Sequence, residues 1–167
     1  MSGPFFPFSQ KTEKLVENGD FSQVNMLGLP FDWDYRADSA DWISVKKDSG
    51  YNYLELNAPS GSTIYMIQHL AEFKPGKNYL IRWKVKGDST ARYRVYIEWH
   101  DKNKKSGDPS FLKSVNGNSW TKPGNEWTTM EFKFTSFGEE YVNPYFVLNA
   151  KGPGRIGFSD VDIIQIN

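Results

Sequence analysis

The sequence contains no cysteine, and its 20 basic side chains are balanced by 20 acidic ones, so that the formal charge is zero. The absence of cysteine excludes disulfides and thiol chemistry, but it leaves the cellular compartment open. The charge balance gives no support to nucleic acid or an anionic membrane surface as a partner, since both require a basic excess on one face. No run approaches the roughly 18 apolar residues of a membrane-spanning helix, so we expect no membrane insertion.

Helical patterning is lacking as well. No segment combines a 3.6-residue apolar period with capping residues, so we expect almost no helix. Short runs in which apolar and polar residues alternate are separated by clusters of Gly, Pro, Asn and Asp, a pattern typical of strands joined by turns. About nine such runs predict an all-β chain folded as an antiparallel β-sandwich.

The length of 167 residues is that of one domain, and it is sufficient to bury one core without disulfides. We place this domain at residues 15–167 and treat residues 1–14 as an N-terminal extension or linker. The first ten residues have neither the basic region nor the apolar stretch of a signal peptide, so none is predicted there. Aromatic residues make up 16% of the chain, which is more than such a core needs, so some rings are expected at the surface as recognition elements.

Residues 64–99 form the stretch around which the rest of the chain is arranged. They contain three alternating runs, which we expect to be strands of one central sheet. Between the first two runs, residues 74–77 (Lys-Pro-Gly-Lys) suit a type II turn, because Pro presets φ at the second position and Gly accepts a positive φ at the third. In the last run, one face carries an apolar set and the other carries Arg94, Tyr96 and Glu98.

Four short motifs, in this order and spacing, resemble those of a known family. They are Asn-Gly-Asp-Phe at 18–21, Asp-Ser-Gly-Tyr at 48–51, the run from Gln68 to Tyr79 with its Pro-Gly turn, and Ile-Gly-Phe-Ser-Asp-Val at 156–161. Together they resemble the signature of jelly-roll carbohydrate-binding modules of the family-four, family-nine, family-sixteen and family-twenty-two kind. The resemblance covers residue 15 to the C-terminus.

The resemblance implies a galactose-binding-like β-sandwich with jelly-roll topology and no catalytic activity of its own. Such a module binds a polysaccharide or oligosaccharide along its concave sheet or at loops on one edge, with aromatic rings stacked on sugar faces. It is usually attached to a secreted glycoside hydrolase and directs that enzyme to its substrate. By resemblance, we expect an extracellular or cell-surface location and a catalytic domain tethered to this chain.

The resemblance also implies a structural calcium ion, held between the opening strand, the loop near residue 50 and the closing aspartate. The corresponding residues here are Asp20, Asp48 and Asp160. Ser22 stands where the family usually has a glutamate, which removes one carboxylate from a cation that prefers several oxygen ligands. Asp20 or backbone carbonyl groups would have to replace it.

Sugar binding requires flat rings for the C–H faces of a pyranose and polar groups for its hydroxyls. Strand alternation places such polar groups on the face of the central sheet that points away from the core: Gln68, Arg82, Arg94, Tyr96 and Glu98. A neighbouring strand would add Asn143 and Tyr145 to that face. The alternative is an ordinary solvated face with an Arg–Glu cross-strand pair, and the pattern does not separate the two.

Trp120 is the sharpest single candidate for a stacking ring, because it lies between two loop signals with little sheet to pack against. We therefore expect it to be exposed. In the early loop, Trp33 stands where the family usually has a core tryptophan, so burial is expected there. Tyr35 is expected to be free to contact a ligand.

Two other classes of function are an enzyme and a protein-interaction domain. A glycanase needs two carboxylates at close spacing, and the sequence has no Glu-x-Asp-x-x-Glu strand that would supply them. The chain has only two histidines and no phosphate loop, zinc cluster or nucleophile elbow, so we expect no catalytic residues. A cell-surface protein-interaction or adhesion sandwich would use aromatic loops equally well.

Overall fold

The computed structural model describes residues 15–117 and 119–167, so the predicted extension at 1–14 lies outside the described residues. The regular secondary structure of the described chain consists of strands and one 3-10 turn, η2 (Ala40–Trp42). None of its helices is long or apolar enough to cross a membrane. The strands are β1 (Asp34–Arg36), β2 (Ile43–Asp48), β3 (Tyr51–Ala58), β4 (Thr63–His69), β5 (Asn78–Gly87), β6 (Arg92–Asp101), β7 (Leu112–Val115), β8 (Thr128–Thr135), β9 (Tyr141–Lys151) and β10 (Gly154–Gln165).

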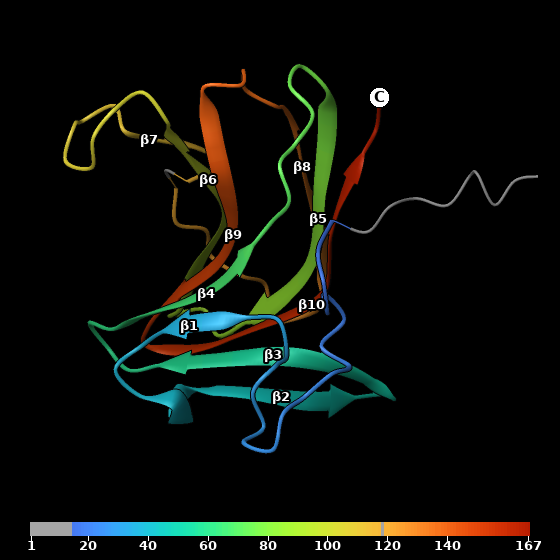
Figure 1. Cartoon of the computed structure of the whole chain (residues 1–167). Helices are drawn as coiled ribbons and strands as arrows, with labels where there is room; N and C mark the ends of the chain where they lie inside the picture. The colour runs from blue at the N-terminus through green and yellow to red at the C-terminus, as the bar shows by residue number, and fades with distance from the viewer. Residues whose placement is uncertain (1–14, 118) are drawn as a thin grey trace, which may run out of the picture.

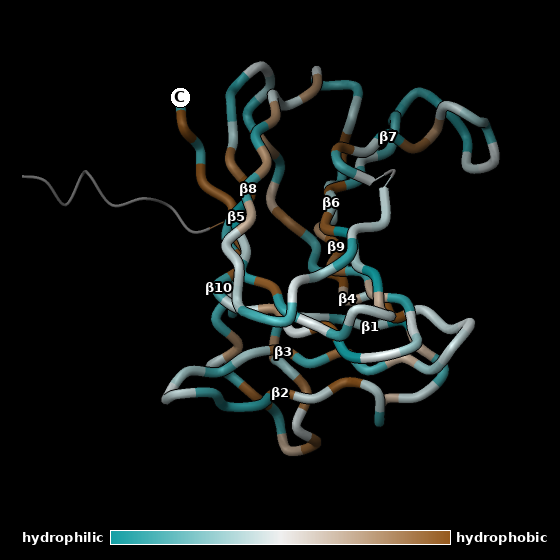
Figure 2. The backbone as a smooth tube through the Cα atoms, turned by 180° about the vertical axis from the view of Figure 1, so that it is seen from behind, coloured by the Kyte–Doolittle hydropathy of each residue, from teal (hydrophilic) through white to brown (hydrophobic). Residues whose placement is uncertain are grey.

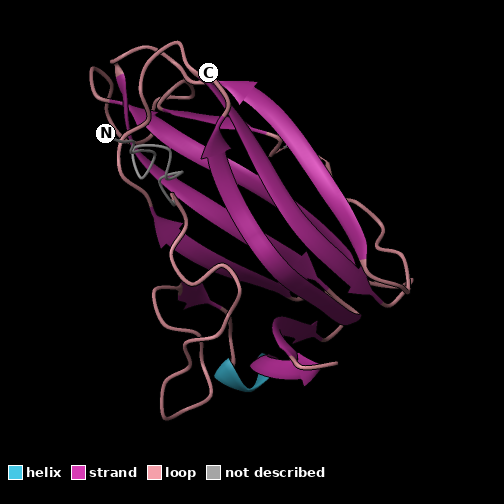
Figure 3. Cartoon of the chain, turned by 90° about the vertical axis from the view of Figure 1, so that its right-hand side faces the viewer, coloured by secondary structure: helices cyan, strands magenta, loops and turns pink. Residues whose placement is uncertain are grey.

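The strands form two five-stranded sheets that lie face to face (Figures 1 and 3). The first sheet has the order β1-β4-β9-β6-β7, and the second has the order β2-β3-β10-β5-β8. All the paired strands are antiparallel. This arrangement is the predicted all-β antiparallel sandwich.

The core fills the space between the two sheets. Along β4, and at both ends of β6, buried residues alternate with less buried ones, and the tube in Figure 2 changes between brown and teal along the strands. Leu54 and Phe158 from the second sheet and Ile97 and Phe146 from the first are fully buried. Burial of each such side chain contributes about 1.5–3 kcal/mol relative to leaving it exposed. Trp33 also belongs to the core, as predicted.

The type II turn at residues 74–77 is confirmed, with Gly76 at φ +74° and the amide of Lys77 donating to the Lys74 carbonyl at 3.3 Å. The expected single sheet for residues 64–99 is wrong, however. β4 and β6 belong to the first sheet, whereas β5 belongs to the second. The turn therefore carries the chain from one sheet to the other, so that β4 and β5 are consecutive strands without being hydrogen-bonded partners.

Residues 15–22 contain a turn, and Asn18 and Phe21 in this segment have positive φ. Two of the strands are short, β1 before the 3-10 turn and β7 within residues 101–118. Both sit at edges of the first sheet, where a strand needs only one partner.

Candidate functional site

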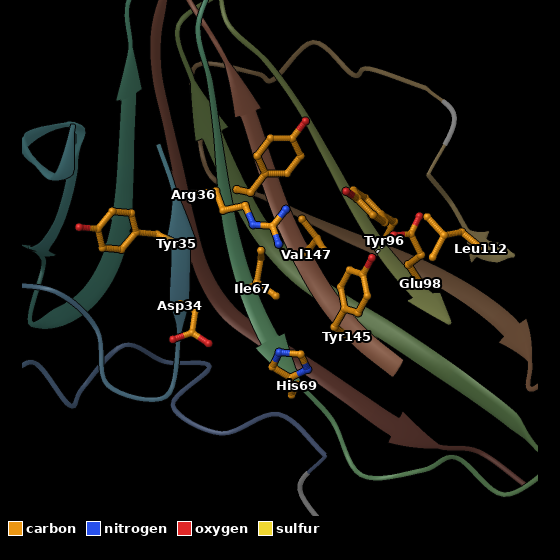
Figure 4. Close-up of a pocket in the computed structure, with 11 residues that line it drawn as sticks. Asp34, Tyr35, Arg36, Ile67, His69, Tyr96, Glu98, Leu112, Tyr145 and Val147 are labelled. Carbon is orange, nitrogen blue, oxygen red and sulfur yellow. Dashed lines mark hydrogen bonds between the residues drawn. The ribbon is translucent and has the colours of Figure 1, made fainter. Parts of the chain in front are cut away.

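The outer face of the first sheet, which points away from the core, carries a cleft of about 530 Å³ (Figure 4). β1, β4, β9, β6 and β7 all contribute to it. The residues that line it are Asp34, Tyr35, Arg36, Tyr65, Ile67, His69, Tyr96, Glu98, Leu112, Tyr145 and Val147.

The middle of the cleft has an apolar floor. Ile67 pairs with Val147 across β4 and β9, and the same row continues to Asp34 on β1 and Tyr96 on β6. Strand alternation brings these side chains to one face, since residues paired in register point the same way. Val147 is buried although it faces outward, so side chains that rise around it cover it.

The next row of the cleft holds a hydrogen-bonded pair. His69, Tyr145 and Glu98 lie in register on β4, β9 and β6. The Tyr145 hydroxyl donates a hydrogen bond to the Glu98 carboxylate, and the His69 ring lies 6.1 Å from the Tyr145 ring, centroid to centroid. Burial raises the pKa of Tyr145 far above its usual range, and the hydrogen bond to Glu98 and the charge of that carboxylate raise it further. Tyr145 therefore stays protonated and presents a fixed ring edge to the cleft.

On the other side of the floor, a row of polar groups is fixed by Arg94. Its Nε donates to Asn149 Oδ1 and its Nη1 donates to the Gly117 carbonyl, both at 2.9 Å. Asn149 is fully buried and donates in turn to the Ile64 carbonyl. Arg94 therefore ties the loop after β7 to the sheet.

Tyr96 lies between these two rows. Its ring is buried, and the Arg94 guanidinium lies 5.5 Å from the ring centroid. The pKa of Tyr96 is raised to about 12, mainly by burial and then by the negative charge of Glu98. The positive charge of Arg94 acts in the opposite direction and lowers this pKa. Tyr96 is thus a neutral, immobilised wall of the cleft.

Trp120 is half-buried, whereas the sequence predicted that it would be exposed. Its ring is held between two cations, with the Arg94 guanidinium carbon at 4.2 Å and Lys151 Nζ at 4.6 Å from the ring centroid. Such cation–π contacts contribute about 0.5–1 kcal/mol each at exposed sites. The ring therefore serves partly to fix its own loop beside the cleft.

The structure brings Tyr96, Glu98 and Tyr145 together, as alternation predicted. Tyr35 borders the cleft, but its ring points away from the other lining side chains (Figure 4). Asn143 lies outside the cleft and has a positive φ, and its backbone N–H donates to the Glu72 carboxylate at 3.0 Å.

Two predicted contacts lie elsewhere. Gln68 faces the core, not the solvent, and is 5% exposed. Its amide accepts from the Glu17 N–H at 2.8 Å and donates to the carbonyls of Glu17 and Asp32, so it fastens the N-terminal segment to β4. Arg82 lies on β5 in the second sheet, where it pairs with Glu131 at 2.8 Å, and so it cannot reach the cleft.

The sequence analysis did not identify several of the residues that line the cleft. These residues lie on β1 or on the outward face of β4: Asp34, Arg36, Tyr65, Ile67 and His69. The alternation on β4 contains the signal, since Ile64 and Met66 are buried and their neighbours are not. Gln68 continues the buried set, and treating it as outward concealed the true outward set.

The three aspartates expected to hold calcium do not make a suitable site. The Asp160 carboxylate pairs with Lys84 at 3.1 Å, and Asp48 accepts from Trp127 Nε1 at 3.1 Å and Lys86 Nζ at 3.2 Å. The hydrogen bonds from Trp127 and Lys86 hold the pKa of Asp48 below its usual range. Among the described residues, no group of three or more acidic, histidine or cysteine side chains is placed to hold a metal ion. These donors fit two ammonium groups better than calcium.

The cleft holds two carboxylates on strands that are not neighbours. Asp34 is on β1 and Glu98 is on β6, three strands apart in the sheet, so that their backbones are about 14 Å apart at the usual strand spacing.

The fold occurs in solved structures of known function. The chain is similar to TmCBM61 in complex with β-1,4-galactotriose, at 13% identity and a TM-score of 0.61 over 92% of this chain and 99% of that one. It is similar to the CBM22-1 xylan-binding domain from Paenibacillus barcinonensis Xyn10C, at 11% identity and a TM-score of 0.61 over 93% and 96% of the two chains. It is also similar to the enzymatically active domain of tailspike protein 4 from bacteriophage CBA120, at 15% identity and a TM-score of 0.62. The matched region makes up 92% of this chain but only 21% of that one.

These likenesses establish the fold, and no curated protein matches the chain. The family is established by the sequence itself. Residues 13–153 match the model of the family described as carbohydrate binding domain. The match spans most of the chain, and the chain therefore belongs to the carbohydrate binding domain family.

Proposed function

We propose that this chain is a non-catalytic module that binds a polysaccharide or oligosaccharide in the cleft of the first sheet. The observation that carries the proposal is the group of tyrosine rings, a carboxylate and a guanidinium that line the cleft around its apolar floor. Sugars have apolar C–H faces that pack on such rings and hydroxyls that hydrogen-bond to polar side chains, most strongly to charged ones.

In this proposal each group has a distinct task. Tyr65, Tyr96 and Tyr145 supply ring faces and edges for the pyranose. Glu98 and Arg36 supply an acceptor and donors for hydroxyls. Because Tyr145 already fixes the Glu98 carboxylate, little conformational freedom is lost when a sugar binds.

We further propose that the module directs an attached polysaccharide-degrading enzyme to its substrate outside the cell or at the cell surface. The bacteriophage structure supports this arrangement, because the matching sandwich makes up only 21% of a larger enzymatically active domain. A module that holds the enzyme on its substrate raises the effective concentration of cleavable bonds.

The test is a glycan array followed by calorimetric titration of the best ligand, with β-1,4-galactotriose and xylan included as probes. Tyr96→Ala and Tyr145→Ala are expected to weaken binding by about twofold to tenfold, since a stacked ring contributes about 0.5–1.5 kcal/mol beyond its buried area. Phe31→Ala removes an exposed ring that does not line the cleft and is the matched control. Unchanged affinity in both tyrosine variants would place the ligand elsewhere.

One observation favours a second function, that of a protein-interaction sandwich. Met26 and Leu27 are exposed at the tip of a loop, and the Asn25 side chain accepts from the N–H groups of Leu27 and Leu29 and so keeps that tip ordered. An ordered apolar tip suits a contact with another protein. Absence of binding across plant, algal and host glycans would support this function over carbohydrate binding.

A further inference from the structure

The second sheet has a cavity of its own on its outer face, which is the opposite side of the sandwich from the cleft. It measures about 210 Å³ and lies among β3, β5 and β10. Its lining is made of Tyr53, Glu55, Lys86, Gly87, Asp88, Asn125, Arg155 and Gly157. We propose that this cavity is a second glycan-binding site that holds a single neutral sugar ring. That the ligand is a sugar rests on the proposed function, whereas the position of the second site does not.

The aromatic wall of this second site is fixed in place. The Tyr53 ring packs edge-on against Trp127, with 5.3 Å between centroids and an interplanar angle of 76°. The Trp127 indole N–H donates to Asp48 at 3.1 Å, and the Lys86 ammonium lies over both rings, 5.4 Å from Tyr53 and 4.8 Å from Trp127. Rings held in this way need no reordering when a ligand arrives.

A glycine allows the rings to lie close to the sheet. Gly157 pairs with Glu55 on one side and Lys86 on the other, so the central strand contributes no side chain to this row. A Cβ atom at Gly157 would lie 3.2 Å from the Tyr53 ring and 3.3 Å from the Trp127 ring. The missing side chain leaves a shallow floor of backbone beside the aromatic wall.

The polar wall is equally rigid. Arg155 Nε and Nη2 donate to the two carboxylate oxygens of Asp88 at 3.2 and 3.4 Å. The backbones reinforce this pair, since the Arg155 N–H donates to the Asp88 carboxylate at 2.8 Å and the Asp88 N–H donates to the Arg155 carbonyl at 2.9 Å. Both groups keep unused donors and acceptors, which suit the hydroxyls of a sugar.

Size and charge define the occupant. The cavity is smaller than the roughly 300–1,000 Å³ of sites for drug-sized ligands, so it suits one ring of a glycan chain. Its lining holds two basic and two acidic side chains, Lys86 and Arg155 against Glu55 and Asp88. This balance favours a neutral sugar over a uronic acid or a phosphorylated one.

A module with sites on both faces would hold two glycan chains at once, or two stretches of one chain. Immobilised polysaccharide would then bind with greater avidity than a short oligosaccharide. With short ligands, the expected stoichiometry is two.

The test is a ¹H–¹⁵N NMR titration of the intact chain with β-1,4-galactotriose and with xylo-, cello-, manno- and laminari-hexaose. The readouts are the indole N–H of Trp127 and the amides of Gly157 and Asn125 for the second site, and the amides of Tyr96 and Tyr145 for the cleft. At least one probe should shift both sets. Tyr53→Ala should then weaken binding at the second site by about tenfold and leave the cleft unchanged. Asn125→Ala, which alters an exposed side chain, repeats the test without removing a packed ring.

The outcomes separate the two proposals. Shifts confined to the cleft would overturn the second site and leave the proposed function intact. Shifts confined to Trp127, Gly157 and Asn125 would support the second site and place the main ligand away from the cleft. Second-site shifts that persist unchanged in both variants would overturn the proposal, as would the absence of any shift with all probes.

Discussion

Glu98 and Tyr145 face each other directly across the β6–β9 pair, and the Tyr145 hydroxyl donates a hydrogen bond to the Glu98 carboxylate. The pair joins a neutral ring to a charged acceptor in the row next to the apolar floor of the cleft. A sugar that packs on the ring is therefore within reach of the carboxylate. This relationship leads to the first prediction.

Glu98→Gln is expected to weaken glycan binding by roughly threefold to thirtyfold. The amide still accepts from Tyr145, so the ring keeps its place, but hydrogen bonds to a charged group are worth about 1.5–3 kcal/mol against about 1 for a neutral one. Calorimetric titration measures the difference. Glu131→Gln, which removes an exposed carboxylate from the second sheet, should leave the affinity unchanged.

Tyr96 gives a prediction for alkaline pH. Its pKa is raised to about 12 by burial and then by the charge of Glu98, whereas an unfolded tyrosine ionises near about 10. Between these values the unfolded state releases a proton that the folded state retains, so stability is full below about pH 10 and falls as pH rises toward about 12. The loss from Tyr96 is about 1 kcal/mol by about pH 11.

Denaturant unfolding at a series of pH values measures this effect. Tyr96→Phe should lose less stability than the parent chain over the same interval, because it has no phenol to ionise. Tyr35→Phe alters an exposed phenol at the border of the cleft and is the control. Equal slopes in the parent and Tyr96→Phe would contradict the raised pKa.

Arg94 is predicted to be needed for the loop beside the cleft. Arg94→Lys should destabilise the fold by about 1–2 kcal/mol, because one ammonium cannot replace the two directed bonds to Asn149 and Gly117 and the planar contact with Trp120. Chemical denaturation gives the value. Arg82→Lys, an exposed ion pair on the other sheet, should change stability by less than about 0.5 kcal/mol.

The fold was predictable because its signals are local. Alternation of period two and the turn at residues 74–77 mark strands and their ends without knowledge of their partners. On β6 the same signal correctly placed Arg94, Tyr96 and Glu98 outward, and the irregularity in pairing begins only after Glu98. Alternation does not state which sheet a strand joins, and so Arg82 was assigned to the wrong sheet.

The larger omission came from one residue. Gln68 is polar and was placed outward, yet its amide is satisfied by backbone groups of the N-terminal segment and it is buried. Assigning one side chain to the wrong face of a sheet assigns every side chain of that strand to the wrong face, because successive side chains point to opposite faces. Tyr65 and His69 were therefore missed, although they lie on the same strand as the predicted residue. The bonds of Gln68 join positions 51 residues apart, and no local pattern contains them.

This placement of Gln68 carries its own prediction. Gln68→Leu should lower the free energy of unfolding by about 2–3 kcal/mol, since the Glu17 N–H and the carbonyls of Glu17 and Asp32 lose their partner. Hydrogen exchange should show faster exchange for the Glu17 amide than in the parent chain. Gln165→Leu, at an exposed position of β10, is the control. A ligand affinity that falls while stability is unchanged would restore Gln68 to the list of sugar contacts.

Calcium provides the last prediction. The carboxylates of Asp160 and Asp48 are paired with Lys84 and Lys86, so a divalent cation would have to displace ammonium groups that already neutralise them. The nearby Phe21 carbonyl, a further oxygen donor, already accepts from the Asn52 side chain at 2.8 Å. We therefore expect about 1 mM calcium, or its removal with a chelator, to shift the melting temperature by less than about 1 °C. A site with a Kd of about 10 μM would instead add about 2.7 kcal/mol, or roughly 5–10 °C, which calorimetry would detect at once. A saturable rise of that size would show that the folded chain binds calcium and would contradict this prediction.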